Sequence, residues 1–142
     1  MAELAWELEH SIDADVSPGF AWSFMTDVTN WDDPPATFEL EGPFTAGARG
    51  ITRFPEQEPR HWRLGTVHPL ESYVVEGELD GAAISFEWRF DRLADGTRLT
   101  QHIRLAGEKA AAYVDEVQAA FVPNLGPGME RIAAAIERAE GI

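Results

Sequence analysis

The stretch from Ile84 to Leu105, ISFEWRFDRLADGTRLTQHIRL, decides the class of fold. Apolar and polar residues alternate on both sides of Asp95-Gly96, a dipeptide that is typical of a tight hairpin turn. Alternation of this kind places the apolar side chains of two neighbouring strands on one face of a sheet. The residues on that face are Ile84, Phe86, Trp88 and Phe90 before the turn, and Leu99, Gln101, Ile103 and Leu105 after it. The stretch therefore predicts an antiparallel hairpin with one apolar and one polar face.

The same period of two occurs in the segments before this hairpin. It covers residues 4–12 at the N-terminus and, further along, residues 38–41, 49–54, 61–68 and 72–79. Glycine, proline and the dipeptide Asp80-Gly81 mark the turns between the later segments. Six consecutive strands joined by short turns, with one more strand ahead of them, predict a seven-stranded antiparallel sheet that is dry on one face.

Two segments have a helical period instead. Ser17-Pro18 is a typical helix start, with serine as the cap and proline at the first position, and predicts short helices between the first and second strands. Near the C-terminus, an apolar stripe keeps its phase and predicts one long helix over residues 110–140, kinked at Pro123 and Pro127. The only apolar face available to cover that stripe is the face of the sheet. We therefore predict an α+β fold, a single domain over residues 1–142, whose twisted sheet curls around the long C-terminal helix.

A curled sheet around a helix leaves a wedge of space wherever side chains do not meet, and that wedge is the expected ligand site. Aromatic walls with a few polar groups suit a flat, apolar, partly oxygenated ligand, although the same rings can simply fill a core. Gly126 and Gly128 remove side-chain volume from the helix opposite, or else act only as kink residues. The expected ligand contacts are Trp31, Trp62, Tyr73, Phe86, Trp88, Gln101, Phe121, Leu125 and Met129.

Three titratable residues are candidates for chemistry at this site: His10, Tyr73 and Arg53. His10 shares a face with apolar neighbours, so it is either a hydrogen-bonded core residue or an acid–base group. Arg53 either turns inward, where it could hold a carboxylate or enolate oxygen, or stays in water at the sheet edge. The amide of Gln101 needs a partner on the apolar face, which a ligand carbonyl, a protein group or water could supply.

The remaining histidines and the paired glutamates are expected on or near the outer face. His102 falls among polar residues and is predicted to be solvated, and Glu7/Glu9 and Glu39/Glu41 alternate with apolar residues that point inward. His61 and His68 would lie on opposite faces of a regular strand unless Gly65 marks a bulge that resets the register. The pattern leaves open whether His68, Glu76 and Glu78 face the cavity. No metal-ligand spacing occurs, and we expect neither a metal nor a cofactor.

Charge and composition narrow the classes of partner. The chain has 25 acidic and 11 basic residues, a net charge of −14, and a single lysine, Lys109. Nucleic acids and anionic membranes are bound by clustered Lys and Arg, so we expect neither partner. No apolar run approaches the roughly 20 residues that cross a bilayer, and the start MAELAWELEH is no secretory signal, which favours a cytoplasmic protein. The absence of cysteine excludes disulfides and thiolate chemistry, and the oligomeric state stays open.

Several local motifs occur in an ordered series along the chain. They are Ser11-Ile12-Asp13-Ala14 leading into Ala21-Trp22, Gly47-Ala48-Arg49-Gly50, Val67-His68-Pro69, and Asp95-Gly96-Thr97-Arg98-Leu99-Thr100. With the order of strands and helices, this series resembles the START/Bet v-type superfamily (SRPBCC), in its polyketide cyclase/dehydrase and lipid-transport branch. The resemblance spans essentially the whole chain.

The resemblance implies a helix-grip fold with an apolar cavity for a small hydrophobic or aromatic molecule, such as a polyketide, lipid or quinone. If the chain is an enzyme, the family implies cyclisation, aromatisation or dehydration of a polyketide-like ligand. No catalytic signature is common to the family, so it assigns no catalytic residue here. Members that resemble chaperone partners suggest an alternative, a protein-interaction module whose acidic outer sheet docks a basic partner.

Overall fold

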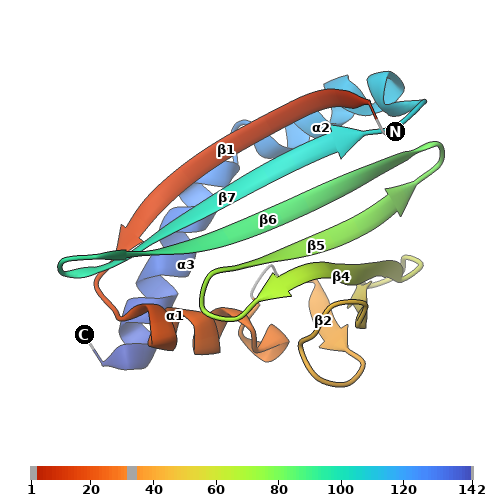
Figure 1. Cartoon of the computed structure of the whole chain (residues 1–142). Helices are drawn as coiled ribbons and strands as arrows, with labels where there is room; N and C mark the ends of the chain where they lie inside the picture. The colour runs from red at the N-terminus through yellow and green to blue at the C-terminus, as the bar shows by residue number, and fades with distance from the viewer. Residues whose placement is uncertain (1–2, 32–34, 142) are drawn as a thin grey trace.

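A computed structural model describes residues 3–31 and 35–141 and contains the predicted seven-stranded antiparallel sheet (Figure 1). Its strands are β1 (Leu4–Ala14), β2 (Thr37–Leu40), β3 (Arg49–Arg53), β4 (Arg60–His68), β5 (Ser72–Leu79), β6 (Ala82–Leu93) and β7 (Gly96–Ala106). They lie side by side in the order β1-β7-β6-β5-β4-β3-β2. Strands β2 to β7 therefore form the predicted meander, and β1 adds to it by pairing with β7.

Two short helices connect β1 to β2, as predicted: α1 (Pro18–Met25) and the 3₁₀ turn η1 (Val28–Asn30). The Ser17 hydroxyl oxygen accepts a hydrogen bond from the Phe20 amide at 3.2 Å, and Pro18 occupies the first helical position. This local chemistry is the N-cap that the sequence indicates. The C-terminal part of the chain forms the 3₁₀ turn η2 (Ala110–Tyr113) and the helices α2 (Val114–Phe121) and α3 (Leu125–Glu140).

The prediction of one continuous C-terminal helix was wrong, because the chain breaks between α2 and α3. Pro123 has no amide hydrogen to donate, so the helical ladder is interrupted there. The Asn124 amide donates to the Phe121 carbonyl at 3.1 Å, and the Asn124 side chain donates to the Ala120 carbonyl at 2.8 Å. Pro127 falls in the first turn of α3, where amide hydrogens have no helical partner, and does not break the helix.

The core lies between the inner face of the sheet and the helices α1 and α3. The helices contact mainly β1, β6 and β7, and Figure 1 shows α2 and α3 crossing behind β1 and β7. Fully buried core residues include Ala21, Leu99, Ile103, Met129 and Ile136. None of the helices in the described part of the chain is both long and apolar enough to cross a membrane.

The register of β4 decides where the ambiguous polar residues lie. Pairing with β5 shifts between Leu64 and Val67, so the bulge expected near Gly65 is present. Leu64 then pairs with Val75 and Val67 with Tyr73 on the inner face. The remaining positions, His61, His68, Glu76 and Glu78, fall on the outer face. None of these four residues faces the predicted ligand site.

Candidate functional site

Three neighbouring cross-strand rows of side chains lie at the centre of the inner face of the sheet, and we call these three rows the inner wall. Antiparallel pairing fixes the rows, because residues directly opposite one another on neighbouring strands share a face. The first row is His10, Gln101, Trp88 and Tyr73; the second is Leu8, Ile103, Phe86 and Val75; the third is Trp6, Leu105, Ile84, Gly77 and Trp62.

The inner wall is sealed in some places and half-buried in others. Tyr73, Ile103 and Leu105 are at most 1% exposed. A contiguous group on β4, β5 and β6 is only half-buried. We call this group the half-buried patch; it consists of Trp62, Val75, Gly77, Ile84 and Phe86. The helices contact β1 most extensively, and β6 mainly through α1. Apolar side chains that keep surface accessible at the centre of a core-facing sheet can contact a ligand.

Fixed aromatic side chains border the half-buried patch. Phe121 of α2 meets Phe86 edge to face, with ring centroids 5.5 Å apart. At the opposite border, the Trp62 indole donates a hydrogen bond to the Thr52 hydroxyl at 3.0 Å and stacks on Trp31 at 5.3 Å. The Trp31 indole in turn donates to the Met25 carbonyl at 2.7 Å. Because Trp62 and Trp31 are held by hydrogen bonds as well as by packing, this border is preorganised.

The floor of the patch lacks a side chain at Gly77, between Trp62 and Ile84. A methyl group built on Gly77 would have the Ile84 Cγ2 atom at 3.4 Å as its nearest side-chain neighbour. Gly50 of β3 lies opposite Trp62, and the indole of Trp62 occupies the space that a Cβ on Gly50 would need. The patch therefore has room for added volume at Gly77 and none at Gly50.

Four of the predicted ligand contacts are buried in the core. Trp88 (6% exposed), Leu125 (8%), Met129 (1%) and Tyr73 (1%) are buried. The Tyr73 ring packs among Trp22 and Phe44, with centroids 6.0 and 5.0 Å away. Burial raises the pKa of the Tyr73 phenol well above its usual range, so the group stays neutral. The structure thus assigns Tyr73 to packing rather than to an accessible acid–base position.

The polar candidates His10 and Gln101 lie together in the first row. His10 is exposed, which removes the expectation of a core histidine, and Gln101 is half-buried rather than enclosed. A methyl group on Gly126 of α3 would come within 3.6 Å of the His10 Cε1 atom, so the imidazole lies against the first turn of that helix. No side-chain hydrogen bond joins either residue to another residue that the structure describes, and neither has a polar atom buried without a partner.

Arg53 lies on the outer face, so the inward alternative is excluded. It pairs with Thr37 of β2, and its guanidinium donates to the Glu39 carboxylate in an exposed ion pair. The residues of β3 that point inward are Gly50 and Thr52, which are buried. Sharing a face with Ile51 did not make Arg53 an inner residue, because Ile51 itself is on the outside.

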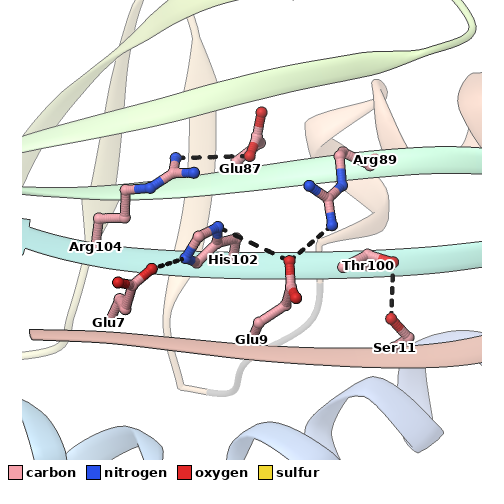
Figure 2. A network of polar contacts seen from close by, with 8 residues as sticks. All are labelled: Glu7, Glu9, Ser11, Glu87, Arg89, Thr100, His102 and Arg104. Carbon is pink, nitrogen blue, oxygen red and sulfur yellow. Dashed lines mark hydrogen bonds and ion pairs between the residues drawn. The ribbon is translucent and has the colours of Figure 1, made fainter.

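The outer face of β1, β7 and β6 carries a network of alternating charges (Figure 2). His102 Nε2 lies 2.6 Å from the Glu7 carboxylate and Arg89 donates to Glu9 at 2.7 Å. The His102 side chain is only 13% exposed, which corrects the prediction that it is solvated. Arg104 lies beside Glu87, within 3.5 Å.

Ion pairs also occur further along β1 and β7 and on the outer face of β4 and β5. Arg63 pairs with Glu76 at 3.0 Å, and Arg98 pairs with Asp13 at 2.9 Å. The guanidinium of Arg98 lowers the pKa of the Asp13 carboxyl below its usual range. The outer sheet is therefore a mixed lattice of charge, rather than the uniformly acidic surface that docking of a basic partner would need.

Two hollows of the molecular surface lie away from the inner wall. One, of about 410 Å³, is lined by the start of α1, the turn between β6 and β7, and Glu140. Another, of about 340 Å³, lies on α2 between Asp115 and Pro123. Neither contains a residue of the predicted wedge. Within residues 3–31 and 35–141, no three His, Asp or Glu side chains gather as a metal ion requires.

An antiparallel sheet that grips a C-terminal helical segment and carries a partly open aromatic face defines a helix-grip protein. The chain belongs to the family described as polyketide cyclase/dehydrase and lipid transport, whose model matches residues 5–137. This confirms the resemblance found in the sequence. No curated protein matches the chain in sequence.

Solved structures share the fold at low sequence identity. A protein of unknown function from Staphylococcus aureus is 14% identical, with a TM-score of 0.75, over 99% of this chain and 98% of that one. Norcoclaurine synthase from Thalictrum flavum, in complex with dopamine and hydroxybenzaldehyde, is 15% identical, with a TM-score of 0.71, over 97% and 87%. Ara h 8.0201 is 15% identical, with a TM-score of 0.64, over 94% and 96%.

Three members of the half-buried patch, Val75, Gly77 and Ile84, are absent from the predicted contacts. On strands β4 to β6, the predicted contacts were aromatic residues only, and these three are not aromatic. The alternation contains enough information to find them, because each lies an even number of residues from Tyr73 or Phe86 on the same strand. The alternation does not indicate which of these inner residues stay accessible to solvent.

Proposed function

We propose that the chain binds a small hydrophobic or aromatic ligand against the half-buried patch of its inner wall. The observation that carries the proposal is the incomplete burial of Trp62 and Phe86. Large aromatic side chains contribute most to binding when a partner removes their remaining surface from water, at about 25 cal/mol per Å². The missing side chain at Gly77 leaves a flat stretch of sheet between them on which a planar molecule can lie.

The relatives support this class of ligand. The family is described by cyclisation, dehydration and lipid transport, all of which handle molecules with large apolar surfaces. Norcoclaurine synthase, which has the same fold, was solved with two small aromatic molecules, dopamine and hydroxybenzaldehyde. A polyketide-, lipid- or quinone-like molecule would fit the same description.

The proposal extends to cyclisation or dehydration of a polyketide-like ligand, with His10 as the group that moves a proton. Both reactions need an oriented substrate and an acid–base group near the operating pH. On the inner wall, His10 is an exposed titratable side chain, whereas Tyr73 is sealed and Arg53 lies on the other face. If the chain is an enzyme, His10→Phe should abolish turnover while the variant still binds the apolar part of the ligand, whereas a carrier has no turnover to lose.

Filling the floor of the patch tests the proposal directly. Gly77→Val adds volume between Trp62 and Ile84 with a residue that suits a strand. The matched control is Ser85→Val, the same kind of change at a neighbouring register position on the outer face of β6. We expect the neutral dye N-phenylnaphthylamine to fluoresce with the wild-type chain, and Gly77→Val to weaken its binding about tenfold or more, a loss of about 1.4 kcal/mol.

Thermal unfolding of both variants, followed by circular dichroism, checks that the fold is retained. Ser85→Val should bind the dye as the wild-type chain does. Equal binding by Gly77→Val and the wild type, or equal loss in both variants, would contradict a site on the inner wall.

A further inference from the structure

We propose that the inner wall selects an uncharged aromatic molecule with a hydroxyl or carbonyl oxygen, and that His10 and Gln101 bind this oxygen. The inference rests on the proposed function, since it concerns the same wall. It adds the chemical class of the ligand and names two residues that determine specificity.

The two polar side chains, His10 and Gln101, are neighbours on the inner wall. His10 of β1 and Gln101 of β7 are directly opposite one another and share the inner face. Side chains so paired have Cβ atoms about 4.5–5.5 Å apart. Gln101 is also opposite Trp88, and the neighbouring row contains Phe86. One polar pair therefore borders an otherwise aromatic surface.

His10 and Gln101 have donors and acceptors that no described residue uses. Neither side chain is hydrogen-bonded to any residue that the structure describes, and neither has a buried polar atom without a partner. The half-buried Gln101 amide therefore keeps contact with solvent, and His10 is an exposed residue. An imidazole and a carboxamide can each donate and accept, so together they can bind a hydroxyl or a carbonyl oxygen.

Helix α3 leaves room for the imidazole of His10. Gly126 is in the first turn of α3, and a methyl group there would lie 3.6 Å from His10 Cε1 and 3.7 Å from Nε2. Any larger side chain at position 126 would meet the imidazole ring. The helix thus approaches His10 without covering it, and the ring stays exposed.

The inner wall has no permanently charged cation for an anionic ligand. The described residues that form the three rows of the inner wall include no Lys and no Arg. The chain as a whole carries a net charge of −14. A carboxylate placed on an apolar wall without a cation would be both desolvated and repelled. These conditions favour a neutral ligand over a fatty acid anion or an aromatic acid.

Three probes of one ring system separate these contributions: naphthalene, naphthol and naphthoate, titrated near neutral pH and followed by tryptophan fluorescence. We expect naphthol to bind more tightly than naphthalene by about two- to tenfold for each hydrogen bond formed, and naphthoate to bind most weakly. Gln101→Leu and His10→Leu should each reduce the preference for naphthol while the affinity for naphthalene is kept. His61→Leu, the same replacement at an exposed outer-face histidine, is the matched control and should change nothing.

The outcomes distinguish this inference from the proposed function. Equal affinity for naphthalene and naphthol in the wild-type chain, or a preference that survives in both variants, overturns the polar pair and leaves the apolar site standing. Tighter binding of naphthoate overturns the selection for neutral ligands. Failure of all three probes to bind overturns the inference and the proposed function together. Since His10 is exposed and Gln101 half-buried, both leucine variants should fold, which thermal unfolding verifies.

Discussion

Tyr73 illustrates how one residue can serve the core while resembling a site residue. Its ring is 1% exposed and packs against Trp22, Phe44 and Phe90. An aromatic ring with a polar tip on the inner face fits a ligand site equally well in the sequence, because alternation specifies the face and not the depth. What seals Tyr73 is α1, which contributes Trp22, and the segment around Phe44, neither of which the strand pattern can place.

Burial of Tyr73 predicts a loss of stability in alkali. Below about pH 10, the ordinary pKa of tyrosine, folded and unfolded chains both keep the proton. Above it the unfolded chain ionises while the buried phenol does not, so the free energy of unfolding falls by up to about 1.4 kcal/mol per pH unit. Tyr73→Phe should remove this part of the loss. Urea unfolding of the wild-type chain and of Tyr73→Phe between about pH 8 and pH 11 measures this loss. If the free energy of unfolding falls equally with pH in both, the buried Tyr73 phenol is not its cause.

At the scale of elements, the joint between α2 and α3 is the feature that periodicity could not reveal. The apolar stripe keeps its phase through Val122, Pro123 and Asn124, and a stripe in phase predicts a continuous helix. The break depends on a missing amide hydrogen at Pro123 and on the Asn124 side chain, which satisfies the Ala120 carbonyl. Proline correctly marked the position of the break, although not its extent.

Gly128 near the start of α3 predicts a stabilising substitution. Alanine has a higher helix propensity than glycine by about 0.8–1.0 kcal/mol in a helix interior, and somewhat less is expected in a first turn. A methyl added at Gly128 would meet only the Arg131 guanidinium, at 3.7 Å. We expect Gly128→Ala to raise the free energy of unfolding by about 0.5 kcal/mol, as measured by urea denaturation.

Gly126→Ala provides the comparison, because Gly126 precedes Pro127 and a Cβ on the residue before a proline disfavours the helical conformation. Gly126→Ala should therefore be less stable than Gly128→Ala. Equal gains in the two variants would contradict a restriction by Pro127 on the residue before it.

The strands were predictable because several independent features of the sequence agree. The Asp-Gly turns, the alternation and the short connections each specify the same hairpins, and the register of β6 with β7 follows from them. The site was less predictable. Arg53 belongs to a strand of five residues in which one apolar neighbour, Ile51, lies outside, so parity gave no reliable face. The exposure of Phe86 and Trp62 depends on which strands the helices cover, and local patterns contain no information on that.

For the molecule as a whole, the net charge of −14 predicts a stability that rises with salt. Like charges repel more in the compact state than in the unfolded chain, whereas exposed ion pairs of the kind seen on the outer sheet contribute little each. Raising sodium chloride from about 0.02 M to about 0.3 M shortens the screening length from roughly 20 Å to roughly 6 Å. The melting temperature should increase by several degrees. A decrease would mean that the ion pairs outweigh the repulsion.

The pairing of the first strand with the last has a consequence for biosynthesis. The hydroxyls of Ser11 and Thr100 lie 2.8 Å apart across β1 and β7, although 89 positions separate them in the chain. A ribosome that adds about 5–20 residues per second needs roughly 5–20 s to make the second strand after the first. Throughout that interval the nascent β1 has both of its backbone edges free. A chaperone that holds extended segments would find β1 unpaired during this interval, because β1 can join the sheet only after β7 has been made.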